Sequence, residues 1–194
     1  MTTRFLRRQQ MWTGTWLSWV NFQNNTHEYL MAVVNENLFN FNPGILSKDA
    51  CIVIVHTEWN TDIVGKLLEG CVNILKKYEM RNYKVITVPG AFEIPFAIKN
   101  FWDTYQNKFE KPQAFIALGC VLRGDTPHFD YVCKAVTDGV VHLNLSLPVP
   151  TIFGILTVDN MQQAIDRIGG QHGNKGEEAA ISALKMMSLK YAMS

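Results

Sequence analysis

The stretch Cys51–Val55 reads Cys-Ile-Val-Ile-Val, an unbroken run of apolar and mostly β-branched side chains. Such a run is typical of a parallel strand that is buried on both faces of its sheet. After Asn60, a plausible helix N-cap, apolar residues recur with the helical period. These positions are Ile63, Val64, Leu67, Leu68, Cys71, Val72 and Leu75. The region therefore predicts a buried strand followed by an amphipathic helix.

The same alternation of strand and helix continues along the chain. Further strand patterns lie at residues 83–88, 114–118 and 151–157. Helical patterns lie at about 92–105, 127–146, 160–168 and 176–190. Strands that alternate with helices favour βαβ units with right-handed crossovers. We therefore predict an α/β fold, a three-layer α/β/α sandwich around a central parallel four-stranded sheet.

The bulk composition indicates one domain and argues against several partners. A length of 194 residues, 47% of them hydrophobic, allows one well-filled core. The formal net charge of +1 provides no electrostatic footprint for nucleic acid or an anionic membrane surface. No stretch reaches the roughly 18 uninterrupted apolar residues that a membrane span needs. We expect a soluble protein with no nucleic-acid or membrane partner.

The cysteines and histidines indicate neither disulfides nor a metal site. Cys51, Cys71, Cys120 and Cys133 lie mostly in apolar runs and form no C-x-x-C pair. This pattern favours buried free thiols in a reducing compartment, and we expect a cytoplasmic protein. The five histidines lack the spacings typical of zinc ligands, so we expect no metal.

Residues 1–48 differ in composition from the rest, and we treat them as an N-terminal extension before a domain at 49–194. The first 27 residues contain no acidic residue. They carry Arg4, Arg7, Arg8, Trp12, Trp16 and Trp19, with the tryptophans at helical spacing. An organellar presequence has this composition, and so does an amphipathic helix docked on a neighbouring surface. A start codon placed upstream of the true one is a third interpretation.

The loops after the predicted strands are the places to search for a site, because ligands of α/β sheets bind beyond the strands' carboxyl ends. After the first strand, Trp59 is suited to stacking on a planar ring, or else it covers a helix end. After the second strand, the small residues of 89–91 leave backbone N–H groups free to face a ligand. Glu93 follows where the helix dipole tolerates a carboxylate, although an ordinary strand-to-helix turn has the same pattern.

The loop after the third strand has the densest set of candidates. Gly124 frees the backbone, Asp125 or Thr126 can cap the next helix, and Pro127 suits its first position. Because a helix N-terminus binds anions, we assign phosphate binding to its N–H groups and the Thr126 hydroxyl. The carboxylate of Asp125 would repel the phosphate. His128 in the first turn suits proton transfer near neutral pH, with a structural or solvated histidine as the alternative.

A fourth region, residues 165–178, superficially matches a phosphate-binding P-loop. The match fails because Gly176 follows Lys175 where that motif requires Ser or Thr, and because the segment follows a helix. Arg167 and Lys175 remain candidates for gripping a phosphate or carboxylate. A solvated helix end explains the same residues.

Three motifs together resemble the lumazine synthase family: residues 90–95, 117–132 and 173–176. They follow the family's order and spacing over roughly residues 50–190. The resemblance implies a flavodoxin-like subunit in pentamers with shared active sites, which in some members form decamers or sixty-subunit shells. It also implies condensation of 5-amino-6-ribitylaminouracil with 3,4-dihydroxy-2-butanone 4-phosphate, without a metal or redox cofactor, and a functional link to riboflavin synthase.

The resemblance also implies roles for individual residues. Those near the aminouracil and its ribityl chain are Trp59, Ala91, Phe92, Glu93, Val121, Leu122, Phe153, Lys175 and Glu178. Trp59 matches the aromatic that stacks on the pyrimidine, and Phe153 matches one contributed by a neighbouring subunit. Asp125, Thr126 and Arg167 match the phosphate site, where Arg167 stabilises the departing phosphate. His128 matches the proton shuttle.

Two other functions are compatible with parts of this pattern. A binding protein of the same fold would sequester a flavin or lumazine, but it would need neither His128 nor Arg167. A flavodoxin-like electron carrier would need a Ser/Thr/Gly-rich phosphate loop after the first strand. Residues 57–60 lack the glycine of such a loop, so the synthase is the preferred interpretation.

Overall fold

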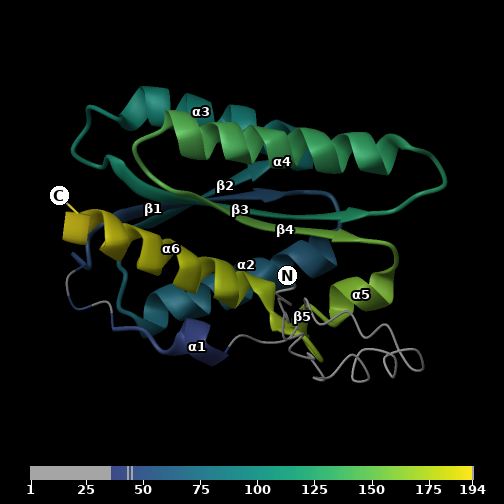
Figure 1. Ribbon diagram of the computed structural model, residues 1–194, viewed down its shortest axis with the longest axis horizontal. Coiled ribbons are helices and arrows are strands. Elements are labelled where there is room, and N and C mark those ends of the chain that lie inside the picture. Colours follow the sequence, from purple (N-terminus) through teal and green to yellow (C-terminus); the bar gives the residue numbers. More distant parts are fainter. Residues whose placement is uncertain (1–35, 43, 45, 194) are drawn as a thin grey trace, which may run out of the picture. The chain divides into compact units, whose positions relative to one another are not determined.

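The computed structural model describes residues 36–42, 44 and 46–193. Its four-stranded parallel sheet has the order β2-β1-β3-β4. The strands are β1 (Cys51–Thr57), β2 (Tyr83–Val88), β3 (Pro112–Leu122) and β4 (Thr151–Val158). Figure 1 shows α3 (Ile94–Tyr105) and α4 (His128–Ser146) on one face, and α2 (Thr61–Lys77) and α6 (Lys175–Met193) on the other. The predicted three-layer α/β/α fold is confirmed.

The side chains of the central strands alternate between two hydrophobic layers. Ile52 and Ile54 are fully buried in the layer under α2 and α6. Val53 and Val55 are fully buried in the layer under α3 and α4. Burial on both faces explains why the strand reads as a continuous apolar run instead of an alternating one.

Two boundaries predicted from the sequence are wrong. Residues 119–122, expected to open a glycine-rich loop, continue β3, because they pair with residues 155–158 of β4. The helix expected to reach Ile168 is α5 (Met161–Ile165), and it ends three residues earlier. Ile168 instead pairs with Asn174 in a hairpin of β5 (Ile168–Gly170) and β6 (Gly173–Asn174). Gly169 has φ +120°, a conformation that L side chains rarely adopt and that a helix does not contain.

The chain before β1 also contributes to the packed body. The short helix α1 (Glu36–Phe39) precedes Phe41, and its Leu38 and Phe39 pack against the layer of α2 and α6. Leu46 is buried in the same layer. The arginine and tryptophan pattern of the first 27 residues lies outside the described residues.

The four cysteines are free thiols, and Cys51, Cys71 and Cys120 are buried as predicted, whereas Cys133 is only half-buried. Burial raises the pKa of Cys71 to about 12 and that of Cys120 to about 11. Over the described residues, no helix combines the length and apolar character needed to cross a membrane. Within the same part of the chain, no three His, Cys, Asp or Glu side chains gather in a way that could hold a metal ion.

Candidate active site

The loops that follow β1 and β2 are joined at the carboxyl edge of the sheet. The Glu58 N–H donates to the Val88 carbonyl over 2.9 Å, and the Trp59 N–H donates to the Pro89 carbonyl over 3.4 Å. A β-carbon added to Gly90 would lie 3.6 Å from Trp59 Cδ1 and 3.1 Å from Glu93 Oε2. The predicted aromatic and carboxylate therefore flank one glycine, and the indole is 72% exposed.

The turn after β2 presents its residues in different ways. The 3₁₀ helix η2 (Ala91–Glu93) begins at Ala91 and ends at Glu93, and α3 follows it directly. Phe92 is 63% exposed, whereas Ala91 is buried in the layer under α3 and α4. Ala91 can therefore contact a ligand through its backbone but not through its side chain. Phe92 and Glu93 can contact a ligand through their side chains.

Asn60 links the loop after β1 to β3 through a side-chain hydrogen bond. It occupies the N-cap position of α2 as predicted, but its side chain does not cap the helix. Its backbone is left-handed at φ 59°, and its Nδ2 donates to the Cys120 carbonyl over 2.9 Å. This hydrogen bond holds the residue after Trp59 against the strand that ends in Val121 and Leu122.

Replacing Asn60 separates the two contributions of this residue. Asn60→Ala loses the hydrogen bond and also places alanine, which lacks asparagine's short polar side chain, in a left-handed backbone conformation. We expect these two effects together to lower the unfolding free energy by about 2 kcal/mol. Asn60→Gly loses only the hydrogen bond and should cost about 1 kcal/mol. Urea denaturation of both variants measures these values, and equal losses would contradict a contribution from the backbone conformation.

The loop after β3 places the predicted proton shuttle at the first residue of α4. Val121 and Leu122 are half-buried at the end of β3, and Asp125, Thr126 and His128 are exposed. The prediction that Asp125 or Thr126 caps α4 is wrong. The chain is already helical at Pro127, the N-cap position, and no side chain caps the helix there. The Asp130 N–H donates to the Pro127 carbonyl over 3.0 Å, so the N–H groups that the first turn can offer an anion are those of His128 and Phe129.

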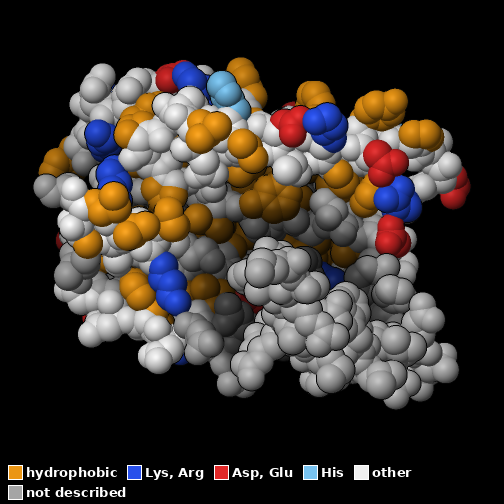
Figure 2. All heavy atoms as spheres, in the orientation of Figure 1, with side chains coloured by type: hydrophobic (Ala, Val, Ile, Leu, Met, Phe, Trp, Pro, Cys, Tyr) orange, Lys and Arg blue, Asp and Glu red, His pale blue; other side chains and the backbone are white. Residues whose placement is uncertain are grey.

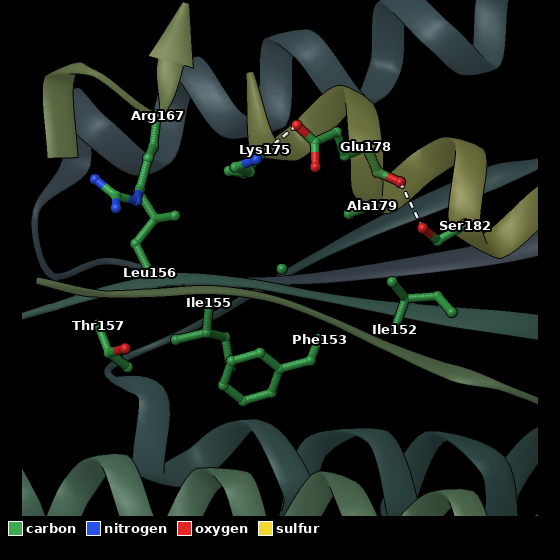
Figure 3. A pocket seen from close by; sticks show the side chains of 11 residues that line it. Ile152, Phe153, Ile155, Leu156, Thr157, Arg167, Lys175, Glu178, Ala179 and Ser182 are labelled. Atoms are coloured by element: carbon green, nitrogen blue, oxygen red, sulfur yellow. Dashed lines mark hydrogen bonds and ion pairs between the residues drawn. The ribbon is translucent and has the colours of Figure 1, made fainter. Parts of the chain in front are cut away.

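A second group of predicted residues lines a cavity of about 400 Å³ along β4 (Figure 3). Its walls include Phe153, Arg167, Lys175 and Glu178. The Lys175 N–H donates to the Arg167 carbonyl over 2.9 Å, so the β5–β6 hairpin brings the two cations together. The Arg167 Nη1 donates to the Gln163 carbonyl over 2.8 Å.

The charges in this cavity suit an anionic ligand. Lys175 Nζ lies 2.7 Å from Glu178 Oε1, and both side chains are about four-fifths buried, at 21% and 19% exposure. Glu178 offsets the charge of Lys175, and Arg167 adds a second cation. Guanidinium groups bind phosphate and carboxylate oxygens through paired N–H donors.

The β4 cavity and the group of Trp59 and Glu93 have different residues within one chain. Phe153 pairs with Ala117 and stands five residues before Val158, the end of β4. Five strand residues span about 16 Å. Trp59, Glu93 and His128 are not among the residues that line the β4 cavity. Phe153 is 40% exposed and lies on the α4 side of β4, opposite Lys175 and Glu178 (Figure 3).

The comparisons with known proteins show the family of the chain. Residues 49–191 match the family described as 6,7-dimethyl-8-ribityllumazine synthase. The chain belongs to this family. A lumazine synthase of Parabacteroides distasonis is 48% identical, over 81% of this chain and 98% of that protein. The enzymes of Phocaeicola vulgatus and Porphyromonas gingivalis are 46% and 43% identical, each over 82% of this chain and at least 95% of the relative.

One residue of the lumazine synthase motif at 173–176 has a structural role that our sequence interpretation missed. Asn174 Oδ1 accepts from the N–H groups of Gly176 over 2.8 Å and Glu177 over 3.4 Å, at the start of α6. Asn174 Nδ2 donates to the Lys66 carbonyl of α2 over 3.2 Å. An asparagine three residues before a glutamate is an N-cap pattern that would have revealed this. Asn174 thus fixes the turn that carries Lys175.

Proposed function

We propose that the chain is a 6,7-dimethyl-8-ribityllumazine synthase. It condenses 5-amino-6-(D-ribitylamino)uracil with 3,4-dihydroxy-2-butanone 4-phosphate and releases phosphate and water. The observation that carries the proposal is that Trp59 and Glu93 flank Gly90 and that His128 begins the helix after β3, all beyond the carboxyl ends of the strands in a chain of this family. The reaction needs neither a metal nor a redox cofactor, because Schiff-base formation, elimination and ring closure require only proton transfers.

The aminouracil binds at the loops after β1 and β2. Trp59 stacks on the pyrimidine, and its high exposure leaves the side chain accessible for this contact. The ribityl chain lies along residues 91–93, where the Glu93 carboxylate accepts its hydroxyl hydrogen bonds. Val121 and Leu122 contact the heterocycle from the end of β3.

The sugar phosphate binds at the start of α4. The phosphate accepts from the N–H groups of the first turn and from Thr126, and Asp125 borders this site. The uracil amine condenses with the ketone, and a proton leaves the carbon next to the resulting Schiff base. His128 moves that proton, and Arg167 stabilises the phosphate as it departs. Much of the acceleration comes from holding two substrates in register.

We also propose that each site is completed by a second copy of the chain, within a pentamer. Phe153 lies about 16 Å before the carboxyl end of β4, and the cavity of Arg167, Lys175 and Glu178 is not lined by Trp59, Glu93 or His128. This cavity runs along β4, an edge strand of the sheet, where a neighbour can reach it. Figure 2 shows hydrophobic side chains on the face formed by α4, β4 and α6. The exposed ones include Val141, Leu145, Phe153 and Met186, a composition suited to a subunit interface.

Mixing two impaired variants tests the shared site. His128→Ala disables one half-site and Arg167→Ala disables the other. In a heterologous interface, each site takes one half from each of two neighbouring subunits. When equal amounts of the two variants co-assemble, each half is intact with a probability of about one half, so about a quarter of the sites combine two intact halves. We therefore expect co-assembled variants to regain about a quarter of wild-type turnover, measured by lumazine absorbance. Activity equal to the average of the two separate variants would contradict a shared site.

The enzyme function itself is tested by adding both substrates to the purified protein. Lumazine formation above the spontaneous rate, followed by absorbance and fluorescence, is the expected result. Tight binding of a flavin without turnover would instead favour the binding protein. We place the reaction in the cytoplasm, in keeping with four free thiols, with riboflavin synthase as the enzyme that uses the product. We propose that residues 49–194 form the catalytic domain.

A further inference from the structure

Arg123 holds three groups around the start of α4. Its Nε lies 2.7 Å from Asp159 Oδ1, and its Nη2 lies 3.2 Å from Asp130 Oδ1. Its Cζ lies 4.0 Å from the centroid of the Phe129 ring, in a cation–π contact. The Arg123 N–H also donates to the Val158 carbonyl over 2.9 Å, which continues the pairing of β3 with β4.

These contacts enclose the segment that carries the proposed phosphate site. Arg123 precedes residues 124–128, while Asp130 and Phe129 follow them. The guanidinium therefore ties the two ends of the loop together. The bond to Asp159 ties the loop to the turn before α5, where Asn160 Oδ1 caps the helix by accepting from the Gln163 N–H over 3.0 Å.

The charge of Arg123 is already matched by its neighbours. Hydrogen bonds that Arg123 donates to Asp159 and then to Asp130 raise the pKa of its guanidinium above the ordinary value. Two carboxylates beside one guanidinium leave little net positive charge for a substrate phosphate. Arg123 thus differs from Arg167, whose guanidinium donates to the uncharged carbonyl of Gln163.

We propose that Arg123 is a positioning residue that holds the loop 124–126 and His128 in the geometry needed for phosphate binding and elimination. This inference rests on the proposed roles of that loop and of His128. The three contacts use the planar fork and flat face of a guanidinium, which a lysine ammonium cannot reproduce. Each ion pair is partly exposed and individually weak, so the contribution lies in geometry more than in stability.

The test compares Arg123→Lys, Arg123→Ala and Asp159→Asn with wild type. Arg81→Ala is the matched control, because Arg81 is exposed and precedes β2 at the opposite edge of the sheet. Steady-state kinetics give kcat and a separate KM for each substrate. Competition by inorganic phosphate reports on the phosphate site, and thermal unfolding reports on the fold.

We expect both Arg123 variants to lose about tenfold in kcat and to show a higher KM for the butanone phosphate, since small displacements of reacting groups have effects of this size. Asp159→Asn should show the same pattern, more weakly. The KM for the aminouracil should stay within about twofold of wild type, because Trp59 is held by other contacts. Arg81→Ala should behave as wild type.

Wild-type kinetics in Arg123→Lys would overturn the proposal, because charge alone would then suffice. Equal increases in both KM values would also overturn it, since that pattern indicates a general loss of structure. If Arg123→Ala does not fold, Arg123→Lys and Asp159→Asn decide the question. If the wild type has no turnover, the proposed function fails. Weaker inorganic phosphate binding in Arg123→Lys would then still support the positioning role, and unchanged binding would overturn it.

Discussion

A Gly176→Ala variant is expected to lose about 4 kcal/mol of unfolding free energy, as a severe overpacking substitution between two helices. A β-carbon at this position would lie 1.9 Å from the Leu67 carbonyl oxygen of α2. Both atoms belong to rigid helices, so neither can move aside as a flexible side chain would. The helices α2 and α6 would have to separate, and the loss would show in urea denaturation and in a lower Tm.

Gly65→Ala is the matched control for this prediction. Gly65 lies within α2, and among the described residues no atom beyond its chain neighbours and its own helix backbone would lie within 4 Å of a β-carbon there. Alanine in an open helical position should stabilise the protein by about 0.5–1 kcal/mol. If Gly176→Ala were as stable as wild type, that result would contradict the close packing of α6 on α2 described above. It would also contradict the positions described for Lys175 and Glu178 at the start of α6.

A His128→Ala variant is expected to lower kcat about a hundredfold and still turn over measurably. Removing a general acid or base costs at least this much when proton transfer limits the rate. Measurable turnover remains because substrate positioning by the other residues is retained. Stability should be nearly unchanged, because His128 is exposed at the first residue of α4.

His142→Ala provides the comparison on the same helix. His142 is also exposed on α4, fourteen residues farther along. Lumazine formation should proceed at the wild-type rate in this variant. Full activity in His128→Ala would refute the proton-transfer role, and a similar loss in both variants would indicate a general effect on α4.

The corrections to the sequence predictions share one physical cause. Residues 119–122 contain a glycine and precede a loop, so their local pattern did not reveal that they pair with β4. Asn60 has a helix-capping side chain, but its amide donates to Cys120, which is 60 residues away. A local pattern reports what a segment favours by itself. Partners that are distant in the sequence decided these cases.

The amino-acid sequence alone determined the fold class and the identity of the family. Period-2 and period-3.6 patterns reflect which face of each element is buried, and burial is the main driving force of folding. The motifs also named Trp59, Glu93, His128 and Arg167 as site residues, and these roles stay predictions for the experiments above.

Only the tertiary structure decided how these residues are grouped. Trp59 and Glu93 converge on Gly90, whereas Phe153, Arg167 and Lys175 line a cavity along the edge strand β4. The tertiary structure also revealed the contacts of Arg123 with Asp130 and Asp159. Spacing along a chain carries no information on strand order or on the distance between strand positions. Those quantities follow from how the strands and helices pack together, because packing alone brings distant segments within contact.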